Sequence, residues 1–306
     1  MVTGQTTEQG TDDELLAVKS DAIRLVQFLQ GYPRLVVAFS GGVDSSVVLA
    51  AAVRAKLDRL IAVTAKSESV AGWQSKLASQ IAGELNVEHW IADTDELSRA
   101  EYQRNDSQRC YFCKQTLYES IARELNQRLG RETGKDSNRS NFSIASGTNH
   151  DDLGDHRPGI QAGTSKGVIT PLASIGLGKQ RVRALAEHWG LGNHDLPASP
   201  CLASRIAYGV SVTKERLWRV EQAENWLYSQ GFREFRVRLH AGELARIEVP
   251  KTEQMKLFNL DADGEMSDYF RQIGFQFVTI DTQGFQSGSL NRQVIPIGIR
   301  RNIPLD

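Results

Sequence analysis

The sequence predicts an α/β fold, a doubly wound parallel sheet followed by a smaller C-terminal α+β domain. Apolar runs at residues 35–39, 60–65 and 87–92 alternate with helical stretches, an order typical of parallel sheets with helices on both faces. A glycine turn follows the first run and opens a helix, which is the layout of an anion site. Beyond residue 208 the strands and helices lose this alternation, which predicts the second domain.

The other elements follow from their apolar periodicity. The predicted helices cover residues 12–30, 47–55, 71–85, 117–129, 179–189, 213–229, 251–260 and 266–273, and the further strands cover residues 142–146, 168–172, 235–239, 245–249 and 275–281. Polar composition predicts a disordered tail at residues 1–11 and a surface loop at residues 131–141. Two prolines mark a boundary near residues 196–208, so the predicted domains span residues 12–197 and 198–306.

The composition is that of an ordinary globular protein, with 306 residues of which 40% are hydrophobic and 24% charged. The net charge of −1 gives no overall attraction to nucleic acid or to membranes, so we expect neither as the main partner. Three cysteines in so long a chain do not make a disulfide scaffold. No signal peptide and no bilayer-spanning run is visible, so we expect a cytoplasmic location.

Residues 40–46 read Ser-Gly-Gly-Val-Asp-Ser-Ser. Glycines let the backbone N–H groups approach a phosphate, and the following helix adds its positive N-terminus. Ser40, Ser45 and Ser46 supply hydroxyl donors, and Asp44 could hold Mg²⁺ or cap the helix. The turn lacks both the Gly-Lys-Ser/Thr of a Walker A loop and the spacing of a dinucleotide-binding turn. A turn that merely caps the helix is the simpler alternative.

Three cysteines form a second candidate centre. Cys110 and Cys113 make a C-x-x-C pair between Arg109 and Lys114, and Cys201 stands alone near the domain boundary. Neighbouring cations lower a thiol pKa, so the pair could be thiolates. A redox pair, a zinc site, buried inert cysteines and a [4Fe–4S] cluster with one iron lacking a protein ligand all remain open. The candidates for the fourth zinc ligand are His89, His150 and His156.

An acidic loop follows the predicted strand at residues 142–146. It carries Asp151, Asp152 and Asp155. The simplest interpretation is that these aspartates cap backbone N–H groups, and the alternative is that they help to place Mg²⁺ or a nucleotide.

The glycine turn resembles the SGGxDS signature of the PP-loop ATP pyrophosphatases, which cleave ATP between the α- and β-phosphates. The motifs SGGVDSS, AVTAKS, RCYFCK, GTNHDDLGDHRPG, SPCLASRIAYG, FRVRLH, ARIEV and TIDTQGFQSGSLN follow one another along the chain. Together they resemble the LarE family of ATP-dependent sulfur transferases over about residues 15–290, without the tail and the polar insertion. The resemblance implies the PP-loop, adenine nucleotide alpha hydrolase-like fold.

The resemblance also implies a reaction and its partners. ATP would adenylate a carboxylate of pyridinium-3,5-biscarboxylic acid mononucleotide, and a sulfur nucleophile would expel AMP to give a thiocarboxylate. The product would serve the nickel-pincer cofactor of lactate racemase. The implied partners are this nucleotide, the upstream and downstream enzymes of that cofactor, and further copies of the chain in a homo-oligomer such as a hexamer.

The resemblance assigns candidate residues as well. The expected ATP contacts are Ala38, Ser40, Gly41, Gly42, Asp44, Ser45, Ser46, Thr64 and Gly147. Asp44 is the expected Mg²⁺ ligand, and Asp44 and Cys201 are the expected catalytic residues. Arg205, Arg236 and Arg238 could contact the substrate phosphate or carboxylate, and the alternative is that they are surface arginines. Asp281 and Ser287 lie in a family motif without an assigned role.

The sulfur source divides this family. In one branch a single cysteine, at the position of Cys201, gives up its own sulfur and becomes dehydroalanine. The additional Cys110 and Cys113 depart from that pattern. They resemble the other branch, in which three cysteines hold a [4Fe–4S] cluster that carries a transferable sulfide.

Three rival functions remain at this point. The first is a cluster-dependent tRNA 2-thiolation enzyme, for which more basic surface or an RNA-binding domain is expected. The second is an amidotransferase-like ligase related to NAD or GMP synthetases, for which the cysteines would be idle. The third is a non-catalytic sensor of nucleotide and metal.

Overall fold

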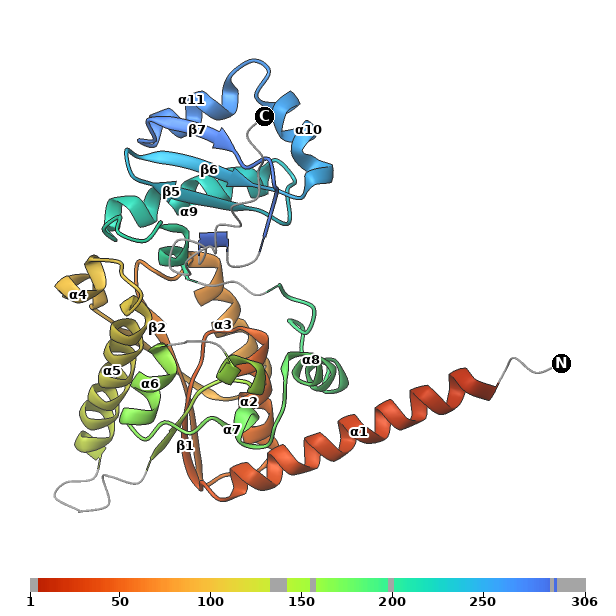
Figure 1. The fold of residues 1–306 in the computed structure, drawn as a ribbon. Helices are drawn as coiled ribbons and strands as arrows, with labels where there is room; N and C mark the ends of the chain where they lie inside the picture. Colours follow the sequence, from red (N-terminus) through yellow and green to blue (C-terminus); the bar gives the residue numbers. More distant parts are fainter. Residues whose placement is uncertain (1–4, 133–141, 155–157, 198–200, 287–288, 291–306) are drawn as a thin grey trace, which may run out of the picture. The chain divides into compact units, whose positions relative to one another are not determined.

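The computed structural model describes residues 5–132, 142–154, 158–197, 201–286 and 289–290 (Figure 1). The chain divides into two compact units. The first comprises Met1–Glu96 and Cys110–Ser199, and the second comprises Leu97–Arg109 and Pro200–Asp306. The segment Leu97–Arg109, which the sequence assigned to the first domain, therefore groups with the second unit.

The first unit contains a four-stranded parallel sheet, which confirms the predicted fold class. Its strands are β1 (Arg34–Ala38), β2 (Arg59–Lys66), β3 (Glu88–Asp93) and β4 (Ser143–Ala145), in the order β3-β2-β1-β4. Because β1 has β2 on one side and β4 on the other, the strand order reverses at β1. In such sheets ligands bind beyond the carboxyl ends of the strands at this switch point, and residues 40–46 begin there.

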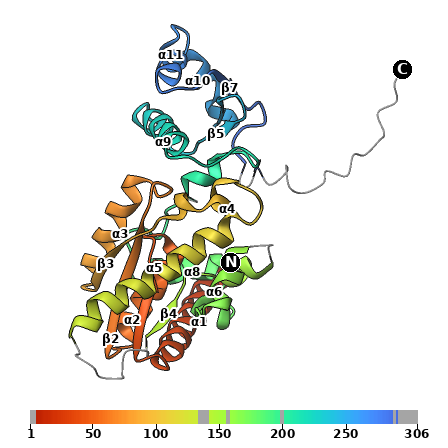
Figure 2. The same cartoon turned by 90° about the vertical axis from the view of Figure 1, so that its left-hand side faces the viewer.

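Two apolar cores cover the two faces of this sheet. Leu35 and Val37 lie in one core with helices α2 (Val43–Arg54), α3 (Gly72–Glu84) and α8 (Lys179–His188). Val36, between them in the strand, points to the other core and packs with Ile121 of α5 (Arg109–Glu132). Figure 2 shows α5 lying across this second face. The helices on both faces explain why the strands read as continuous apolar runs.

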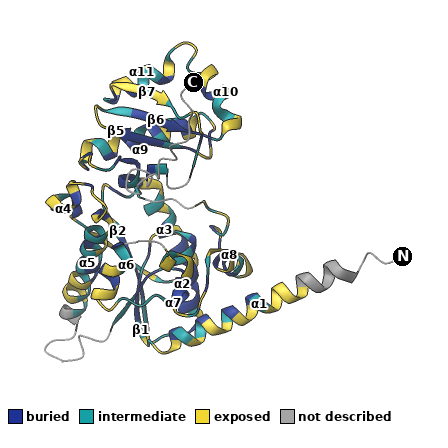
Figure 3. Cartoon of the chain, viewed as in Figure 1, coloured by how far each residue is buried: buried dark blue, intermediate teal, exposed yellow. Residues whose placement is uncertain are grey.

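Helix α1 (Gln5–Gln30) begins earlier than the predicted start at residue 12 and includes residues that the sequence predicted as a tail. Extending an existing helix costs less free energy than starting a new one, so a helix can continue into polar residues. Apolar periodicity cannot detect such an extension, because the added residues have no apolar face. Leu25 and Leu29 anchor the carboxyl half in the core, whereas Leu16 is 63% exposed. Figure 3 shows the change from buried to exposed side chains along α1. Residues 1–4 lie outside the described residues.

Two segments between β3 and α8 differ from prediction. Helix α5 begins at Arg109 rather than near residue 117, so the C-x-x-C pair lies on its first turn. Cysteine and aromatic residues are weak helix formers and concealed this start. Residues 168–172 supply only an isolated bridge, Ala145 to Ile169, before the short helix α7 (Pro171–Ser174). Helix α6 (Pro158–Ser165) precedes this bridge. Most of the predicted surface loop at residues 131–141 lies outside the described residues.

The second unit contains a three-stranded sheet, and the helices α4 (Ala100–Gln103), α9 (Lys214–Ser229), α10 (Gln254–Leu260) and α11 (Glu265–Gln272). Strands β5 (Arg236–His240) and β6 (Leu244–Glu248) are antiparallel, and β7 (Phe277–Ile280) is parallel to β6. This smaller sheet confirms the predicted second domain. The predicted cap Thr213 accepts a hydrogen bond from the N–H of Arg216 at the start of α9.

The two faces of the smaller sheet differ in character. Val237, Leu239, Ala245 and Ile247 are fully buried and make one face apolar. The alternate positions of β5 and β6 carry arginine, histidine and glutamate, apart from the leucine that begins β6. A polar face of this kind is available for a site.

None of the helices in the described part of the chain combines the length and the apolar character that crossing a bilayer requires.

Candidate active site

The glycine turn joins the end of β1 to the start of α2. Gly41 has a left-handed φ of 72°, and a Cβ at this position would lie 3.0 Å from the backbone of Ala78. Only glycine fits there without strain. Gly42 is the N-cap of α2, and no side chain caps the helix. The N-terminus of α2 is therefore left without a side-chain cap, which suits a bound anion.

The three serines of the turn do not have equivalent positions. The Ser45 hydroxyl donates to the Gly42 carbonyl at 3.0 Å and lies 3.3 Å from the Ser40 hydroxyl. Ser40 is exposed. Ser46 is fully buried, and its Oγ accepts a hydrogen bond from Asn193 Nδ2 at 2.9 Å. Ser40 is therefore the serine most accessible to a ligand, whereas Ser46 stabilises the turn from the protein interior through its bond to Asn193.

Gly147 follows β4 and packs against the turn. A Cβ on Gly147 would lie 2.7 Å from the backbone nitrogen of Ser45, closer than side-chain carbons approach backbone atoms. The segment after β4 therefore touches the glycine turn directly, although the two are far apart in sequence.

We expect Gly147→Ala to displace the glycine turn, because the added Cβ would lie 2.7 Å from the backbone nitrogen of Ser45 and one of the two backbones must shift. The cost in the free energy of unfolding should be about 1–3 kcal/mol, the usual cost of overpacking. Chemical denaturation measures this cost, and Gly154→Ala is the control, since nothing lies within 4 Å of a Cβ there. A Gly147→Ala protein as stable as the wild type would contradict the close packing.

Asp44 lies on the first turn of α2 and is partly buried. Burial raises the pKa of its carboxyl group, the Asn149 side chain opposes this by donating to Oδ1 at 3.0 Å, and the Asp152 carboxylate raises the pKa further. A cation beside this partly buried carboxylate would stabilise its charged form. Magnesium bound to phosphates and to one or two carboxylates is a common arrangement, so Asp44 fits such an ion.

The acidic loop has mainly a structural role where the structure describes it. Asp151 accepts a hydrogen bond from the backbone N–H of Lys179 at 2.7 Å, at the start of α8. Asp152 accepts one from the backbone N–H of Asn149 at 3.2 Å. Both therefore bond backbone N–H groups, as the simpler interpretation predicts. Asp155 and His156 lie outside the described residues.

Thr64 is buried on β2, and its hydroxyl donates to the Phe39 carbonyl at 2.8 Å. Since that bond uses its only proton, Thr64 Oγ1 accepts from His89 Nε2, which lies 2.8 Å away. Burial lowers the pKa of His89, so the neutral ring with a proton on Nε2 is favoured. Thr64 and His89 thus support the strand ends that carry the turn.

Cys110 and Cys113 lie one helical turn apart at the start of α5. Side chains at this spacing share a face of the helix, so the two sulfur atoms fit neighbouring ligand positions of one metal centre. Cys201 belongs to the second unit and is partly buried. Among the described residues no group of three or more His, Cys, Asp or Glu side chains is arranged to hold a metal ion. The three-cysteine site therefore stays a prediction.

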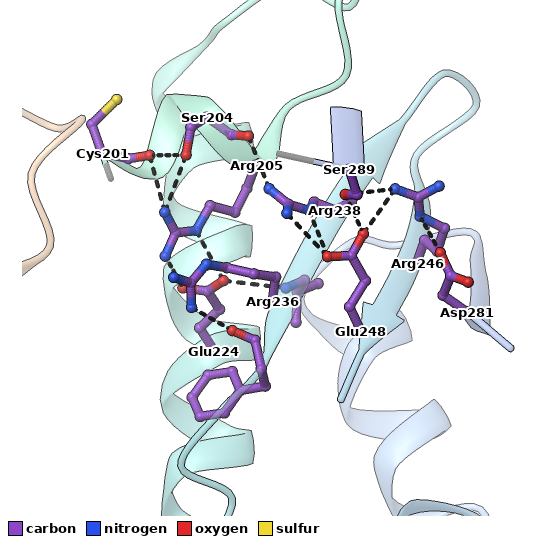
Figure 4. Close-up of polar contacts among 12 residues, drawn as sticks. Cys201, Ser204, Arg205, Glu224, Arg236, Arg238, Arg246, Glu248, Asp281 and Ser289 are labelled. Atoms are coloured by element: carbon purple, nitrogen blue, oxygen red, sulfur yellow. Dashed lines mark hydrogen bonds and ion pairs between the residues drawn. The ribbon is translucent and has the colours of Figure 1, made fainter. Parts of the chain in front are cut away.

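The three candidate arginines of the second unit lie together, as Figure 4 shows. Arg205 is 3% exposed and Arg238 is 5% exposed, so the alternative of surface arginines is wrong for both. Arg205 donates through Nε and Nη2 to Glu224 at 3.0 and 3.2 Å. Arg238 donates through Nε and Nη2 to Glu248 at 3.1 and 3.0 Å.

Arg236 lies beside the other two arginines and is less buried than they are. Burial lowers the pKa of its guanidinium to about 10, the two neighbouring arginines add to this effect, and the carboxylates of Glu224 and Glu248 oppose it. Its Nη1 donates to the carbonyl of the preceding residue, Phe235, at 2.6 Å. A bound anion would stabilise the charged form of this guanidinium.

Hydrogen bonds join this arginine cluster to the segment that carries Cys201. The Cys201 carbonyl accepts from Ser204 Oγ at 2.7 Å and from Arg205 Nη1 at 3.3 Å. The Ser204 carbonyl accepts from Arg238 Nη1 at 3.2 Å. Figure 4 shows Cys201 at the edge of the arginine cluster. The second unit therefore places the backbone of Cys201 beside the arginine cluster.

The segment Leu97–Arg109 holds the chain that follows Cys201. Asn105 is fully buried, and its Nδ2 donates to the carbonyl groups of Ile206, Ala207 and Val210 at 3.2, 2.9 and 2.8 Å. Arg109 Nη1 donates to Asn105 Oδ1 at 2.6 Å and to the Ala203 carbonyl at 2.7 Å. The hydrogen bonds of Asn105 and Arg109 explain why the segment Leu97–Arg109 groups with the second unit.

Sequence reasoning missed several residues of these sites. Asn149, Asn193, Glu224 and Glu248 are polar residues in stretches that were interpreted as loop, helix or strand. Asn149 and Glu248 had a signal, because they lie inside the GTNHDDLGDHRPG and ARIEV motifs. Arg246, also missed, donates to Glu248 Oε1 at 2.9 Å and lies 3.6 Å from the Asp281 carboxylate, which gives Asp281 a structural contact. Ser287 lies outside the described residues.

Comparison with known proteins agrees with this geometry. A model of the queuosine biosynthesis protein QueC family matches residues 34–109, which include β1, the glycine turn and β2. An uncharacterized protein of Synechocystis is 38% identical over 90% of this chain and 98% of its own length. The pyridinium-3,5-bisthiocarboxylic acid mononucleotide synthase of Lactiplantibacillus plantarum is 32% identical over 87% of this chain and 92% of its own length. The chain therefore belongs to the LarE family of PP-loop sulfur transferases, the family of this synthase.

Proposed function

We propose that the protein uses ATP to adenylate a carboxylate of pyridinium-3,5-biscarboxylic acid mononucleotide and then converts that group to a thiocarboxylate. The observation that carries this proposal is the 32% identity to the bisthiocarboxylic acid mononucleotide synthase over 87% of the chain. The glycine turn at an uncapped helix N-terminus supports the use of ATP. The product would be a precursor of the nickel-pincer cofactor.

In the first step the substrate carboxylate attacks the α-phosphorus of ATP, and pyrophosphate leaves with the electron pair of the broken P–O bond. The backbone N–H groups of the glycine turn and the Ser40 hydroxyl would bind the phosphates. Asp44 would hold Mg²⁺, which when bound offsets the charge that develops on the leaving pyrophosphate. In the second step a sulfur nucleophile attacks the acyl carbon, and AMP leaves.

The arginine cluster of the second unit would bind the anionic substrate. Glu224 and Glu248 orient the buried guanidinium groups of Arg205 and Arg238, whereas Arg236 is only partly buried and is therefore the arginine most accessible to a ligand. We therefore propose that Arg236 makes the main charge-assisted contact to the substrate phosphate or carboxylate.

We expect Arg236→Ala to raise KM for the dicarboxylate nucleotide by about 10–100-fold, because a hydrogen bond to a charged group is worth about 1.5–3 kcal/mol. KM for ATP should change much less. Steady-state kinetics with each substrate varied in turn measure both constants. Arg233→Ala is the matched control, since Arg233 is an exposed arginine stacked on Tyr228. Equal effects of the two variants would remove Arg236 from the substrate site.

For the sulfur source we propose a [4Fe–4S] cluster bound by Cys110, Cys113 and Cys201, which when present supplies a transferable sulfide. The spacing of the pair on α5 supports two of these ligands. Arg109, the neighbour of Cys110 in the chain, bonds the Ala203 carbonyl two residues after Cys201, which supports a common function for the two segments. The alternative is that Cys201 donates its own sulfur.

The proposal is tested by incubating anaerobically reconstituted protein with ATP, Mg²⁺, sulfide and the dicarboxylate nucleotide. We expect pyrophosphate release that requires the nucleotide, together with a product in which sulfur replaces a carboxylate oxygen, identified by mass spectrometry. Pyrophosphate release that requires tRNA would favour the 2-thiolation enzyme instead. ATP binding without any pyrophosphate release would favour the sensor, and an amide product would favour the ligase.

A further inference from the structure

Asn193 is a buried polar residue in the turn that follows α8. Its side chain is 2% exposed, and Nδ2 donates to the Gly41 carbonyl at 2.8 Å and to Ser46 Oγ at 2.9 Å. Both acceptors belong to the glycine turn. One amide group therefore bonds the turn at its left-handed glycine and at the first helical turn of α2.

The bond to the Gly41 carbonyl determines the direction of a neighbouring N–H group. The Gly41 carbonyl and the Gly42 N–H belong to one planar trans peptide and point in opposite directions. When Asn193 holds the carbonyl on the buried side, the Gly42 N–H is directed to the other side, where it donates a long hydrogen bond of 3.4 Å to Oγ of the exposed Ser40. A glycine with φ of 72° can change the orientation of its peptide readily. The bond from Asn193 therefore keeps the Gly42 N–H pointing to the side on which a ligand would bind.

The turn that carries Asn193 is itself held rigidly. Arg183 on α8 donates to the carbonyl groups of His194 and Leu196 at 2.9 and 2.7 Å. The Leu196 N–H donates to the Asn193 carbonyl at 3.1 Å. A side chain on such a support can transmit a fixed orientation to its partners.

The other end of the Asn193 amide makes no hydrogen bond. Its Oδ1 is buried and has no partner among the described residues. A buried unpaired carbonyl destabilises the folded state, and such groups in native structures call for a functional explanation. Both hydrogen bonds of the Asn193 side chain go to the glycine turn, so we assign its function to that turn.

We infer that Asn193 is a positioning residue for the nucleotide-binding turn, orienting the Gly41–Gly42 peptide so that its N–H faces the ATP phosphates. This inference rests on the proposed function, since it takes ATP as the ligand of the turn. Asn193 acts through Gly41 and Ser46 and does not itself touch the phosphates.

The test compares Asn193→Leu with Ser46→Ala by isothermal titration with Mg-ATP and by thermal unfolding without ligand. Asn193→Leu removes both hydrogen bonds at nearly constant volume, and we expect Kd for ATP to rise about tenfold or more. Ser46→Ala removes one bond and leaves the Gly41 carbonyl held, so its loss of affinity should be smaller. A purely structural role would lower the midpoint of thermal unfolding in both variants without this difference in Kd.

The outcomes separate the inference from the proposed function. Wild-type affinity for ATP in a folded Asn193→Leu protein overturns the inference and leaves the proposed function standing. Absence of ATP binding by the wild-type protein overturns both. If Asn193→Leu does not fold, Asn193→Ala is measured in its place, because water can then occupy the vacated volume; unchanged affinity there likewise overturns the inference.

Discussion

A Cys201→Ser protein is expected to release pyrophosphate and to form no thiocarboxylate. Adenylation would depend on the glycine turn and Asp44, in the first unit, whereas Cys201 belongs to the second. A serine hydroxyl is a far weaker nucleophile and metal ligand than a thiolate, so sulfur transfer should fall by about 10³-fold or more. Pyrophosphate release and product mass, measured in the same reaction, separate the two steps.

The partner variant Cys110→Ser identifies the sulfur source. If a three-cysteine cluster supplies the sulfur, Cys110→Ser should lose iron and multiple turnovers, and the mass of the wild-type protein should not change during catalysis. If Cys201 supplies the sulfur, Cys110→Ser should complete one turnover, and the mass of the protein should fall by that of hydrogen sulfide, because the Cys201 sulfur passes to the thiocarboxylate and dehydroalanine remains. Thiocarboxylate formed by Cys201→Ser would exclude both pathways.

The fold and the glycine turn could be predicted because their signals are local. The apolar runs are themselves the strands β1, β2 and β3. The pair Gly41–Gly42 lies in the turn that it makes possible, between β1 and α2. The cap at Thr213 was predicted for the same reason, since its partner is the N–H of Arg216. Such contacts depend on short-range geometry that sequence patterns reflect directly.

The polar contacts of the sites could not be predicted in this way. Asn193 bonds the Gly41 carbonyl across 152 positions of the sequence, and Arg205 pairs with Glu224, which lies on a different element. From the sequence, Arg205 and Arg238 could equally be surface residues or residues of a binding site. Their burial becomes evident only with the positions of their glutamate partners in the structure. Burial of a charge depends on tertiary contacts, and one sequence carries no periodic signal for them.

An Asp44→Asn protein is expected to lose adenylation and to gain stability at neutral pH. Removing one group that stabilises transition-state charge costs about 10²–10³ in rate, and Asp44 is the proposed Mg²⁺ ligand. Its raised pKa means that the folded protein binds this proton more tightly than the unfolded chain does. Ionisation therefore penalises the folded state as the pH rises above the ordinary value of 3.8, and the penalty is complete above the raised pKa.

Asparagine removes this penalty while keeping the contact, because its Oδ1 can still accept the hydrogen bond from Asn149 Nδ2. The free energy of unfolding should therefore be higher than that of the wild type at about pH 7, and the difference should be smaller near pH 4, where the wild-type carboxyl is largely protonated in the folded state. Urea denaturation at both pH values measures it, with the exposed Asp58→Asn as control. A variant less stable than the wild type at neutral pH would show that Asp44 holds the turn together. A gain in stability with lost adenylation would show that the turn keeps an unfavourable charge for its chemistry.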